Sequence, residues 1–244
     1  MLVVGLTGGI AAGKSTVSTT LREKYKLTVV DADVIAKEVV DPGRKAYKQI
    51  VETFGPEIEG LVNPDDYSLN RALLGKAVFG NKEKLAQLNK IVHPAVKKEI
   101  IWQVLKAYVT FKSIVVLDVP LLYESGLYRV CGLVVTVSCE RQVALERLVD
   151  RNPELSREDA EKRISSQMSN EERNYRADLV IDNNGVQLIL NTAIDSIVKE
   201  IRPLPFITFL DLFPLFGLLS ALYTVALRSI RDKYKGTKPP KKTL

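Results

Sequence analysis

A glycine-rich segment near the start of the chain has the spacing of a phosphate-binding loop. Gly8 and Gly13 are separated by four residues and followed by Lys14 and Ser15, the pattern G-x-x-x-x-G-K-[ST]. In such a loop the backbone N–H groups and the next helix attract phosphate, the lysine adds a mobile positive charge, and the serine hydroxyl reaches Mg²⁺. The sequence therefore predicts a nucleoside triphosphate site. Its expected residues are Gly8, Gly9, Ala11, Ala12, Gly13, Lys14, Ser15 and Thr16, with Ser15 as a metal ligand.

Three aspartates stand at or just after the ends of apolar segments that are typical of strands. Asp31 and Asp33 lie in VVDADVI, and Asp118 lies in VVLDVPLLY. Because open α/β sheets bind ligands at the carboxyl ends of their strands, we expect these carboxylates near the phosphates. Asp31 or Asp33 could accept a proton from an attacking hydroxyl, and Asp118 could bind Mg²⁺. Capping of a helix or a strand end is the structural alternative for each of them.

Arginines in the second half of the chain are candidates for phosphate contacts. Arg147 and Arg151 fall four residues apart on one face of a predicted helix, and Arg163 follows in a strongly charged segment. Guanidinium groups that close on the phosphates stabilise the charge that develops during transfer. Arg147 and Arg151 are therefore predicted to be catalytic, with solvated surface arginines as the alternative.

Further residues are candidates for contacts with the acceptor of the phosphoryl group. Leu121, Leu122 and Tyr123 could form an apolar shelf for a flat group, or could belong to the core. His93 stands directly before Pro94, a pair that predicts the start of a helix. A positioning hydrogen bond from His93 is the functional alternative to a structural role.

Short β-branched segments alternate with amphipathic helical patterns, which predicts an α/β fold with a parallel sheet between two layers of helices. The expected strands are 2–6, 28–30, 114–119, 133–137 and 179–181. The expected helices are 14–25, 34–40, 44–54, 70–79, 82–91, 94–111, 141–151, 158–168 and 186–201. The stretch 41–111 has helices and no convincing strand, so it is predicted to be an inserted acceptor-binding region. Residues 152–176, with a capping box at Ser156, are expected to form a lid over the phosphates.

The composition is that of a globular protein with a basic end. Of the 244 residues, 46% are hydrophobic and 26% are charged, enough for a sizeable core. Two cysteines, Cys131 and Cys139, and the single His93 exclude a disulfide framework and a four-ligand zinc site. Seven of the 35 basic residues and one of the 29 acidic residues lie in 228–244, so the preceding part is neutral. The net charge of +6 therefore describes a basic tail and does not indicate nucleic-acid binding.

Residues 204–227 form a hydrophobic segment with a single charge, Asp211, in 24 residues. This length is enough to cross a hydrocarbon core of about 30 Å. Asp211 and Pro214 argue against a straight span, and the basic residues that follow fit anionic headgroups, which favours a bent segment in one leaflet. We expect membrane association through residues 204–244 with the topology open; an extra helix packed on the domain is the alternative.

Several motifs together resemble those of the dephospho-CoA kinase family over nearly all of residues 1–202. They are LTGGIAAGKST, VDADVIAKEVV, NRALLGKAVF, IVHPAV, VLDVPLLYESGL and RADLVIDNNG, in this order. The resemblance implies a P-loop, nucleoside-monophosphate-kinase-like domain in residues 1–203. It also implies transfer of the γ-phosphate of ATP to the ribose 3′-hydroxyl of dephospho-CoA, the last step of coenzyme A synthesis. In the family's pattern Asp33 matches the general base, His93 lies in the acceptor-binding region and Asn183 lies in the adenine-side loop, although Asn183 could belong to an ordinary Asn-Gly turn.

The resemblance also implies cofactors, partners and a location. ATP and Mg²⁺ are the expected cofactors, and dephospho-CoA, a membrane surface and other CoA-synthesis enzymes are the expected partners. Similar C-terminal extensions occur in eukaryotic members and are absent from compact bacterial ones. This implies the cytosolic face of the mitochondrial outer membrane or endoplasmic reticulum, with the cytoplasm as the alternative.

Two other functions would share the phosphate loop. One is phosphorylation of another small metabolite or of a nucleoside monophosphate on the same fold, because only the acceptor pocket would differ. The other is a membrane-bound nucleotide-binding scaffold without catalysis, against which the intact Lys14, Ser15 and Asp33 argue. A GTPase is disfavoured, since the sequence has no Asn-Lys-x-Asp guanine signature.

Overall fold

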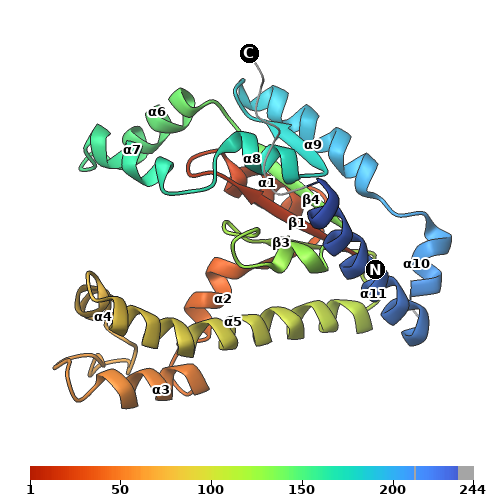
Figure 1. Cartoon of the computed structure of the whole chain (residues 1–244). Helices are drawn as coiled ribbons and strands as arrows, with labels where there is room; N and C mark the ends of the chain where they lie inside the picture. Colours follow the sequence, from red (N-terminus) through yellow and green to blue (C-terminus); the bar gives the residue numbers. More distant parts are fainter. Residues whose placement is uncertain (212, 236–244) are drawn as a thin grey trace. The chain divides into compact units, whose positions relative to one another are not determined.

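The structure, a computed structural model, describes residues 1–211 and 213–235 (Figure 1). Within these ranges the strands are β1 (Leu2–Gly8), β2 (Thr28–Asp31), β3 (Ile114–Asp118), β4 (Leu133–Ser138) and β5 (Leu179–Asp182). They form one sheet in the order β2-β3-β1-β4-β5. Strand β1 pairs in parallel with β3 and β4, and β4 pairs in parallel with β5. The predicted parallel sheet is confirmed, and β3 is buried along its whole length, as a strand covered on both faces should be.

The helices lie between the strands and after the last one. The first group is α1 (Lys14–Glu23), α2 (Ala32–Glu38), α3 (Lys45–Phe54), α4 (Arg71–Val78) and α5 (Lys82–Val109). The second group is α6 (Arg141–Arg151), α7 (Arg157–Ser165), α8 (Asn170–Arg176), α9 (Gln187–Ile201), α10 (Pro205–Asp211) and α11 (Pro214–Lys235). A short 3-10 helix, η1 (Leu127–Val130), precedes β4. The alternation of strands and helices is the one that the apolar patterns predict.

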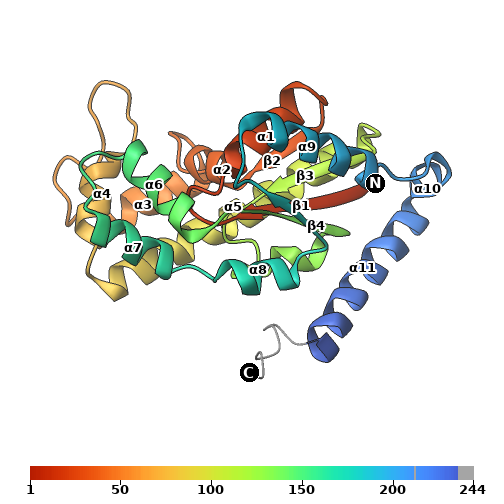
Figure 2. The same ribbon diagram turned by 90° about the horizontal axis from the view of Figure 1, so that it is seen from above.

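The chain forms two compact units, the first of which carries the phosphate loop. It comprises residues 1–29 and the described residues from 107 onward. Helices α1 and α9 cover one side of β1 and β4, and α8 lies on the other side (Figure 2). Val17 and Leu21 of α1 join Ile194 and Val198 of α9 in one core cluster. The core therefore holds the beginning of α1, and with it the phosphate loop, against the sheet.

The second unit comprises residues 30–106 and has a core of its own. Ile50 and Phe54 of α3 are buried together with Leu74 and Val78 of α4. Its extent is close to that of the predicted insertion 41–111, and it begins earlier because α2 belongs to it. Its regular elements from Ala32 onward are helices joined by turns and loops, with one isolated bridge between Val62 and Leu69.

One prediction about this second unit is wrong, namely that His93 and Pro94 begin a new helix. Helix α5 runs without interruption from Lys82 to Val109 and contains Pro94 in its interior. Proline removes one N–H···O bond of the helix ladder. Both side chains are exposed here, so the carbonyl that loses its partner can be solvated, and apolar contacts at Ile91 and Ile100 anchor the helix on either side.

The predicted lid contains two short helices where the sequence indicated one. The capping box is confirmed, because the Ser156 hydroxyl accepts the N–H of Asp159 at 3.1 Å. Helix α7 ends at Ser165, and α8 begins after Ser169, whose side chain accepts the N–H of Glu172. Ser169 and Glu172 form a second S-x-x-E signal, which predicts a helix that the sequence reading missed.

The C-terminal segment folds into α10 and α11, and α11 packs on η1 within the first unit. Arg228 is buried and ion-paired with Asp178, and Arg231 pairs with the same carboxylate. These two arginines therefore do not belong to an unattached basic tail, as the sequence suggested, because Asp178 fixes them to the sheet-bearing unit. Lys238, Lys241 and Lys242 of that predicted tail lie outside the described residues.

No helix within residues 1–211 and 213–235 is both long enough and apolar enough to cross a membrane.

Candidate active site

The loop between β1 and α1 has the backbone geometry of a phosphate-binding turn. Ala11 and Gly13 adopt positive φ angles of 58° and 92°, and α1 begins directly after Gly13. A Cβ atom at Gly13 would lie 2.2 Å from the side-chain nitrogen of Asn183, and one at Gly8 would lie 2.8 Å from the carbonyl oxygen of Val137. Both glycines are needed, since the loop passes too close to its neighbours for any side chain. The turn leaves the amide groups at the beginning of α1 directed out of the helix end.

Lys14 and Asp118 form an ion pair at the carboxyl edge of the sheet. The Lys14 Nζ atom lies 2.5 Å from Asp118 Oδ1, and the side chains are 14% and 3% exposed. Asp118 ends β3 opposite Leu6 of β1, so the strand register brings the carboxylate next to the loop. A long, flexible ammonium side chain held by a buried carboxylate is ready to transfer to a phosphate that enters the loop. The sequence predicted both residues, and the structure brings them together.

Asn183 braces the phosphate loop from the end of β5. Its side-chain amide is buried and donates to the carbonyl of Ala12 at 2.8 Å. Arg147 Nη1 in turn donates to the carbonyl oxygen of Asn183 at 3.0 Å. Arg147 therefore acts on the loop through Asn183. The adenine contact of Asn183 and a direct phosphate contact of Arg147 stay predictions.

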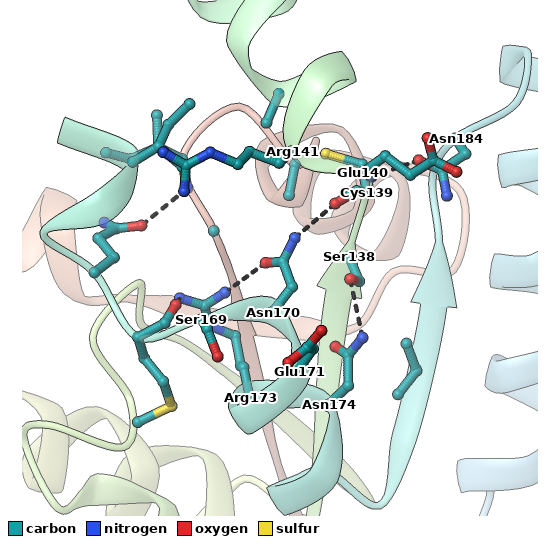
Figure 3. A pocket seen from close by; sticks show the side chains of 18 of the residues that line it. Ser138, Cys139, Glu140, Arg141, Ser169, Asn170, Glu171, Arg173, Asn174 and Asn184 are labelled. Atoms are coloured by element: carbon teal, nitrogen blue, oxygen red, sulfur yellow. Dashed lines mark hydrogen bonds between the residues drawn. The ribbon is translucent and has the colours of Figure 1, made fainter. Parts of the chain in front are cut away.

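A cavity of about 680 Å³ opens beside the loop (Figure 3). It lies between the loop, the ends of β4 and β5, and the α7–α8 corner, which is the connection 166–169 between these helices. Its lining includes Gly9, Ile10, Ala12, Ser138, Cys139, Glu140, Arg141, Gln167, Asn170, Arg173, Asn174, Asp182 and Asn184. Cavities of this size accommodate small ligands and cofactors. The cavity adjoins the phosphate loop, as a nucleotide site must.

Comparison with known proteins identifies the family. A family model described as dephospho-CoA kinase matches residues 2–188. A dephospho-CoA kinase of Saccharomyces cerevisiae is 51% identical over 242 residues, which is 98% of each chain. The chain belongs to the dephospho-CoA kinase family. It is therefore a P-loop kinase, a transferase that uses ATP, and the reaction of its family is the final step of coenzyme A biosynthesis.

Bacterial dephospho-CoA kinases resemble a shorter part of the chain. The enzyme of Bacillus cereus is 48% identical over 199 residues, which is 82% of this chain and 96% of its own. The solved structure of the dephospho-CoA kinase from Campylobacter jejuni superimposes with a TM-score of 0.60 at 25% identity, covering 82% of this chain and 97% of its own. The match to the Saccharomyces relative extends into the C-terminal segment of this chain. The two bacterial proteins match over almost their whole length, but this length corresponds to only 82% of this chain.

Asp31, which ends β2, and Asp33, which follows it, have different environments within the second unit. Asp31 caps α2, since its Oδ1 accepts the N–H groups of Asp33 and Val34 at 2.9 and 3.1 Å. Asp33 lies in the exposed first turn of that helix. The kinase thus uses Asp31 as a helix cap, one of the two roles that the sequence left open for it. Asp33 remains the predicted base.

The predicted acceptor shelf is mostly buried. Leu122 is inaccessible and forms part of the core, whereas Leu121 is 47% exposed. Tyr123 is also buried, with the guanidinium of Arg176 4.3 Å from its ring centre. Burial raises the pKa of Tyr123 to about 12, despite the nearby Thr136 hydroxyl and Arg176. Of the three side chains, which lie in the turn after β3, only Leu121 presents a surface to a ligand in this structure, because the other two are buried.

Other predicted residues lie on the surface. Ser15 and Thr16 are exposed in the first turn of α1, as a metal-binding hydroxyl and its neighbour should be. Arg151 is exposed at the end of α6 and Arg163 is exposed on α7. His93 is exposed on α5 in the second unit. The structure thus brings Lys14, Asp118, Asn183 and Arg147 together, while the roles of these exposed residues stay predictions.

Gln167 and Arg173 are among the cavity residues that sequence reasoning missed. Gln167 Oε1 accepts the N–H of Ile10 in the phosphate loop at 3.0 Å. Arg173 lies in α8 and is buried beside Gly9. The capping box at Ser169 could have revealed α8, but no local pattern indicates which face of so short a helix meets the loop.

Proposed function

We propose that this chain phosphorylates the ribose 3′-hydroxyl of dephospho-CoA, with the glycine-rich loop as the ATP site. The hydroxyl oxygen attacks the γ-phosphorus, the bond from that phosphorus to the β–γ bridging oxygen breaks, and ADP leaves. The observation that carries the proposal is the Lys14–Asp118 pair beside the loop at the carboxyl edge of the sheet. It supports a site in which Lys14 moves onto the outer phosphates when ATP binds.

Asp33 is the residue that takes the hydroxyl proton in this proposal. Asp31 already uses its carboxylate to cap α2, whereas Asp33 stands in the exposed first turn. A general base must come within hydrogen-bonding reach of the oxygen that it deprotonates. Asp31 then orients Asp33, because the N–H that it accepts at 2.9 Å belongs to Asp33 itself.

Mg²⁺ is the proposed metal cofactor, held by Ser15 and Asp118 together with phosphate oxygens and water. These residues fit it, because Mg²⁺ prefers oxygen ligands and takes only one or two of them from the protein. Ser15 is exposed at the beginning of α1, and Asp118 ends β3 beside the loop. The bound ion neutralises charge on the outer phosphates. Asp118 would exchange Lys14 for the metal as Lys14 moves to the phosphates.

Two acceptor contacts are proposed, one in the second unit and one at Leu121 of the first unit. The second unit is a separate helical body with its own core, which allows it to carry a binding surface without disturbing the sheet. His93 is exposed on α5 and Leu121 is exposed after β3. An imidazole and an apolar side chain suit the polar ribose phosphate and the apolar parts of the acceptor.

The activity is tested by incubating the full chain with ATP and single acceptors. We expect phosphorylation of dephospho-CoA at the 3′-hydroxyl, with AMP and shikimate as poor acceptors, and no product with Lys14→Ala. The product is identified by mass spectrometry and by its use in a CoA-dependent enzyme. Preference for a nucleoside monophosphate would replace the proposed acceptor, and binding of ATP without any turnover would favour the scaffold.

We also propose that the C-terminal helices hold the kinase on an anionic membrane surface, at the cytosolic face of an intracellular membrane. The polar face of α11 packs on the rest of the first unit: Arg228 is buried, Arg231 is half-buried, and Asp232 accepts from Tyr128. The apolar side chains point outward, the reverse of a helix that packs on a core. Those exposed are Phe206, Phe209, Phe213, Leu215, Phe216, Leu218, Leu219, Leu222, Tyr223, Leu227 and Ile230.

This arrangement supports a leaflet-bound helix because apolar and basic groups share one end of the chain. An exposed apolar face of this size marks a contact with a membrane or a protein. Lys233 is exposed at the end of α11, and the sequence beyond the described residues adds Lys238, Lys241 and Lys242. Apolar burial supplies attachment that salt does not weaken, and each basic residue near anionic lipid adds about 1 kcal/mol that salt screens.

Vesicle flotation tests the membrane proposal. The full chain should float with vesicles that contain phosphatidylserine and less with pure phosphatidylcholine, and high salt should reduce the difference. Leu222→Glu should weaken flotation, whereas Leu188→Glu, which changes an even more exposed leucine on α9, should not. Equal behaviour of the two variants, or a full chain that never floats, would restore the reading of α11 as a packed surface helix.

A further inference from the structure

Arg173 of α8 is a buried cation in direct contact with the phosphate loop. Only 3% of the surface of Arg173 is exposed. A Cβ atom placed on Gly9 would lie 3.2 Å from its Nη1 atom and 4.0 Å from its Cζ atom. The guanidinium group therefore lies against the loop backbone, at the end of the loop that follows β1.

The guanidinium group has only neutral hydrogen-bond acceptors. Nη1 donates to Asn170 Oδ1 at 2.9 Å, a bond drawn in Figure 3, and Nη2 donates to the Met168 carbonyl at 2.7 Å. Among the described residues, no carboxylate lies within ion-pair distance of it. Burial lowers its pKa, and the more distant Glu124 and Glu172 offset only part of that effect. A buried charge without a counterion is unfavourable, so this group is suited to an anion.

The α7–α8 corner is fixed to the loop and to β4, so the position of the cation is defined. Gln167 Oε1 accepts the N–H of Ile10 at 3.0 Å, and Asn170 Nδ2 donates to the Cys139 carbonyl at 2.6 Å. Asn170 thus joins the end of β4 to the guanidinium of Arg173. The cavity that adjoins the loop contains all of these side chains. An anion that enters the loop would meet Arg173 already held in place, with little reorganisation.

We propose that Arg173 binds an outer phosphate of the bound nucleoside triphosphate and stabilises it during transfer, with Gln167 as the residue that positions the corner. The inference rests on the proposed ATP site, and it names a phosphate ligand that the lid helices supply. Arg173 and Lys14 would then approach the phosphates from two directions, one from α8 and one from α1. Planar guanidinium groups bind phosphate oxygens through two parallel N–H bonds, which neither loop amides nor a lysine provide.

The test measures nucleotide binding without an acceptor, so it does not depend on which acceptor the enzyme uses. Arg173→Gln keeps N–H donors for the neutral partners and removes the charge. Arg173→Lys keeps the charge and loses the planar pair of N–H donors of the guanidinium group. Arg157→Gln is the matched control, because Arg157 is exposed on α7 and faces only Glu161 at 3.9 Å. Affinities for AMP, ADP and a non-hydrolysable ATP analogue are measured for each by calorimetry.

With Arg173→Gln we expect the affinity for the ATP analogue to fall about 10- to 100-fold, the range for loss of one charge-assisted phosphate contact. AMP affinity should be unchanged, and the salt dependence of analogue binding should become shallower. Arg173→Lys should recover part of the loss, and the control should match the wild type. Equal losses for AMP and the analogue, or full rescue by glutamine, would overturn the proposal and leave Arg173 a structural residue.

A second variant covers the case in which Arg173→Gln does not fold. Gln167→Leu removes the acceptor of the Ile10 N–H and leaves Arg173 in place. We expect a lower kcat with little change in AMP affinity, because the corner loses its fixed position. An unchanged kcat together with unchanged binding of the ATP analogue would contradict the positioning role.

Discussion

Two arginines are buried in the sheet-bearing unit, and their partners differ. They lie at opposite ends of the parallel strands, which are called here the amino and the carboxyl edge of the sheet. Arg228 reaches the edge where β4 and β5 begin, donates to the carbonyls of Cys131 and Gly132, and pairs with Asp178. Arg173 lies at the edge where the strands end and has only neutral partners. A cation that is fully paired within the protein serves stability, and a cation left for an incoming anion serves function. Parallel sheets place their ligands at the carboxyl edge, which explains the division.

The largest predicted effect concerns the carboxyl edge, where removing the exposed charge of Asp33 should lower turnover strongly with little loss of stability. Asp33→Asn should lower kcat by about 10²- to 10⁴-fold, the usual contribution of a general base, with nearly unchanged ATP affinity. Lys14→Ala should also abolish turnover but should weaken ATP binding, because Lys14 contacts the nucleotide. Steady-state kinetics and ATP titration separate the two. A near-normal kcat of Asp33→Asn would show that the base assignment is wrong.

The second prediction concerns the opposite edge and reverses the pattern. Arg228→Met should lower the free energy of unfolding by about 3–5 kcal/mol, because Asp178 would remain buried with much of its compensating charge removed. The kcat of the folded enzyme should be unchanged. Urea denaturation followed by circular dichroism measures the loss, and the double variant Arg228→Met/Asp178→Asn should regain part of it. If the Arg228→Met enzyme were as stable as the wild type, the proposed stabilising role of this arginine would be wrong.

A third prediction is that deleting the whole helix pair is milder than the point change. In a chain that ends at Pro203, α11 no longer covers Asp178. Water can then solvate the carboxylate, which in Arg228→Met stays buried with less compensating charge. We expect a loss of roughly 1–3 kcal/mol of unfolding free energy, the scale of a few lost hydrogen bonds, with full kinase activity and no flotation with vesicles. Thermal melting and turnover of the two variants are compared directly. A truncated chain less stable than Arg228→Met would show that α11 contributes mainly by packing.

The smallest predicted effect is a pH dependence that arises from Asp178. Burial raises the pKa of this carboxyl, but the hydrogen bonds and charge of Arg228, with the Val134 N–H and Arg231, outweigh burial and lower the pKa overall. The associated stability is present above the ordinary aspartate pKa of about 4 and is lost as the pH falls through the lower folded value. Unfolding free energies measured between neutral and acidic pH should therefore decline less in Arg228→Met/Asp178→Asn than in the wild type. Parallel curves would contradict this origin.

The sequence predicted what depends on local patterns. The G-x-x-x-x-G-K-S spacing located Lys14, and the end of an apolar strand located Asp118, because a parallel sheet brings strand ends to one edge. Arg173 could not be found in this way, since its contact with Gly9 depends on the direction in which α8 leaves the α7–α8 corner. The local signal for α8 was the pair Ser169 and Glu172, which predicts a helix but not its contacts.

The start of the predicted basic tail, Arg228 and Arg231, was misjudged for a different reason. The prediction used the average hydrophobicity of the C-terminal segment and not the positions of its polar residues. Gly217, Thr224, Arg228 and Arg231 fall on one side of a helix, and this side packs on the rest of the first unit. That spacing was available in the sequence. What the sequence does not contain is the carboxylate that receives the arginines, because Asp178 lies 50 residues away from Arg228 along the chain.

Asp178 also has a mechanical consequence. One carboxylate accepts the Val134 N–H at the beginning of β4 and holds both Arg228 and Arg231 of α11. If α11 is attached to a surface, tension on it passes through this side chain into the beginnings of the two strands. The load then enters the sheet at the ends of the strands opposite the phosphate loop. An enzyme tethered in this way can be pulled without distorting the site where it binds nucleotide.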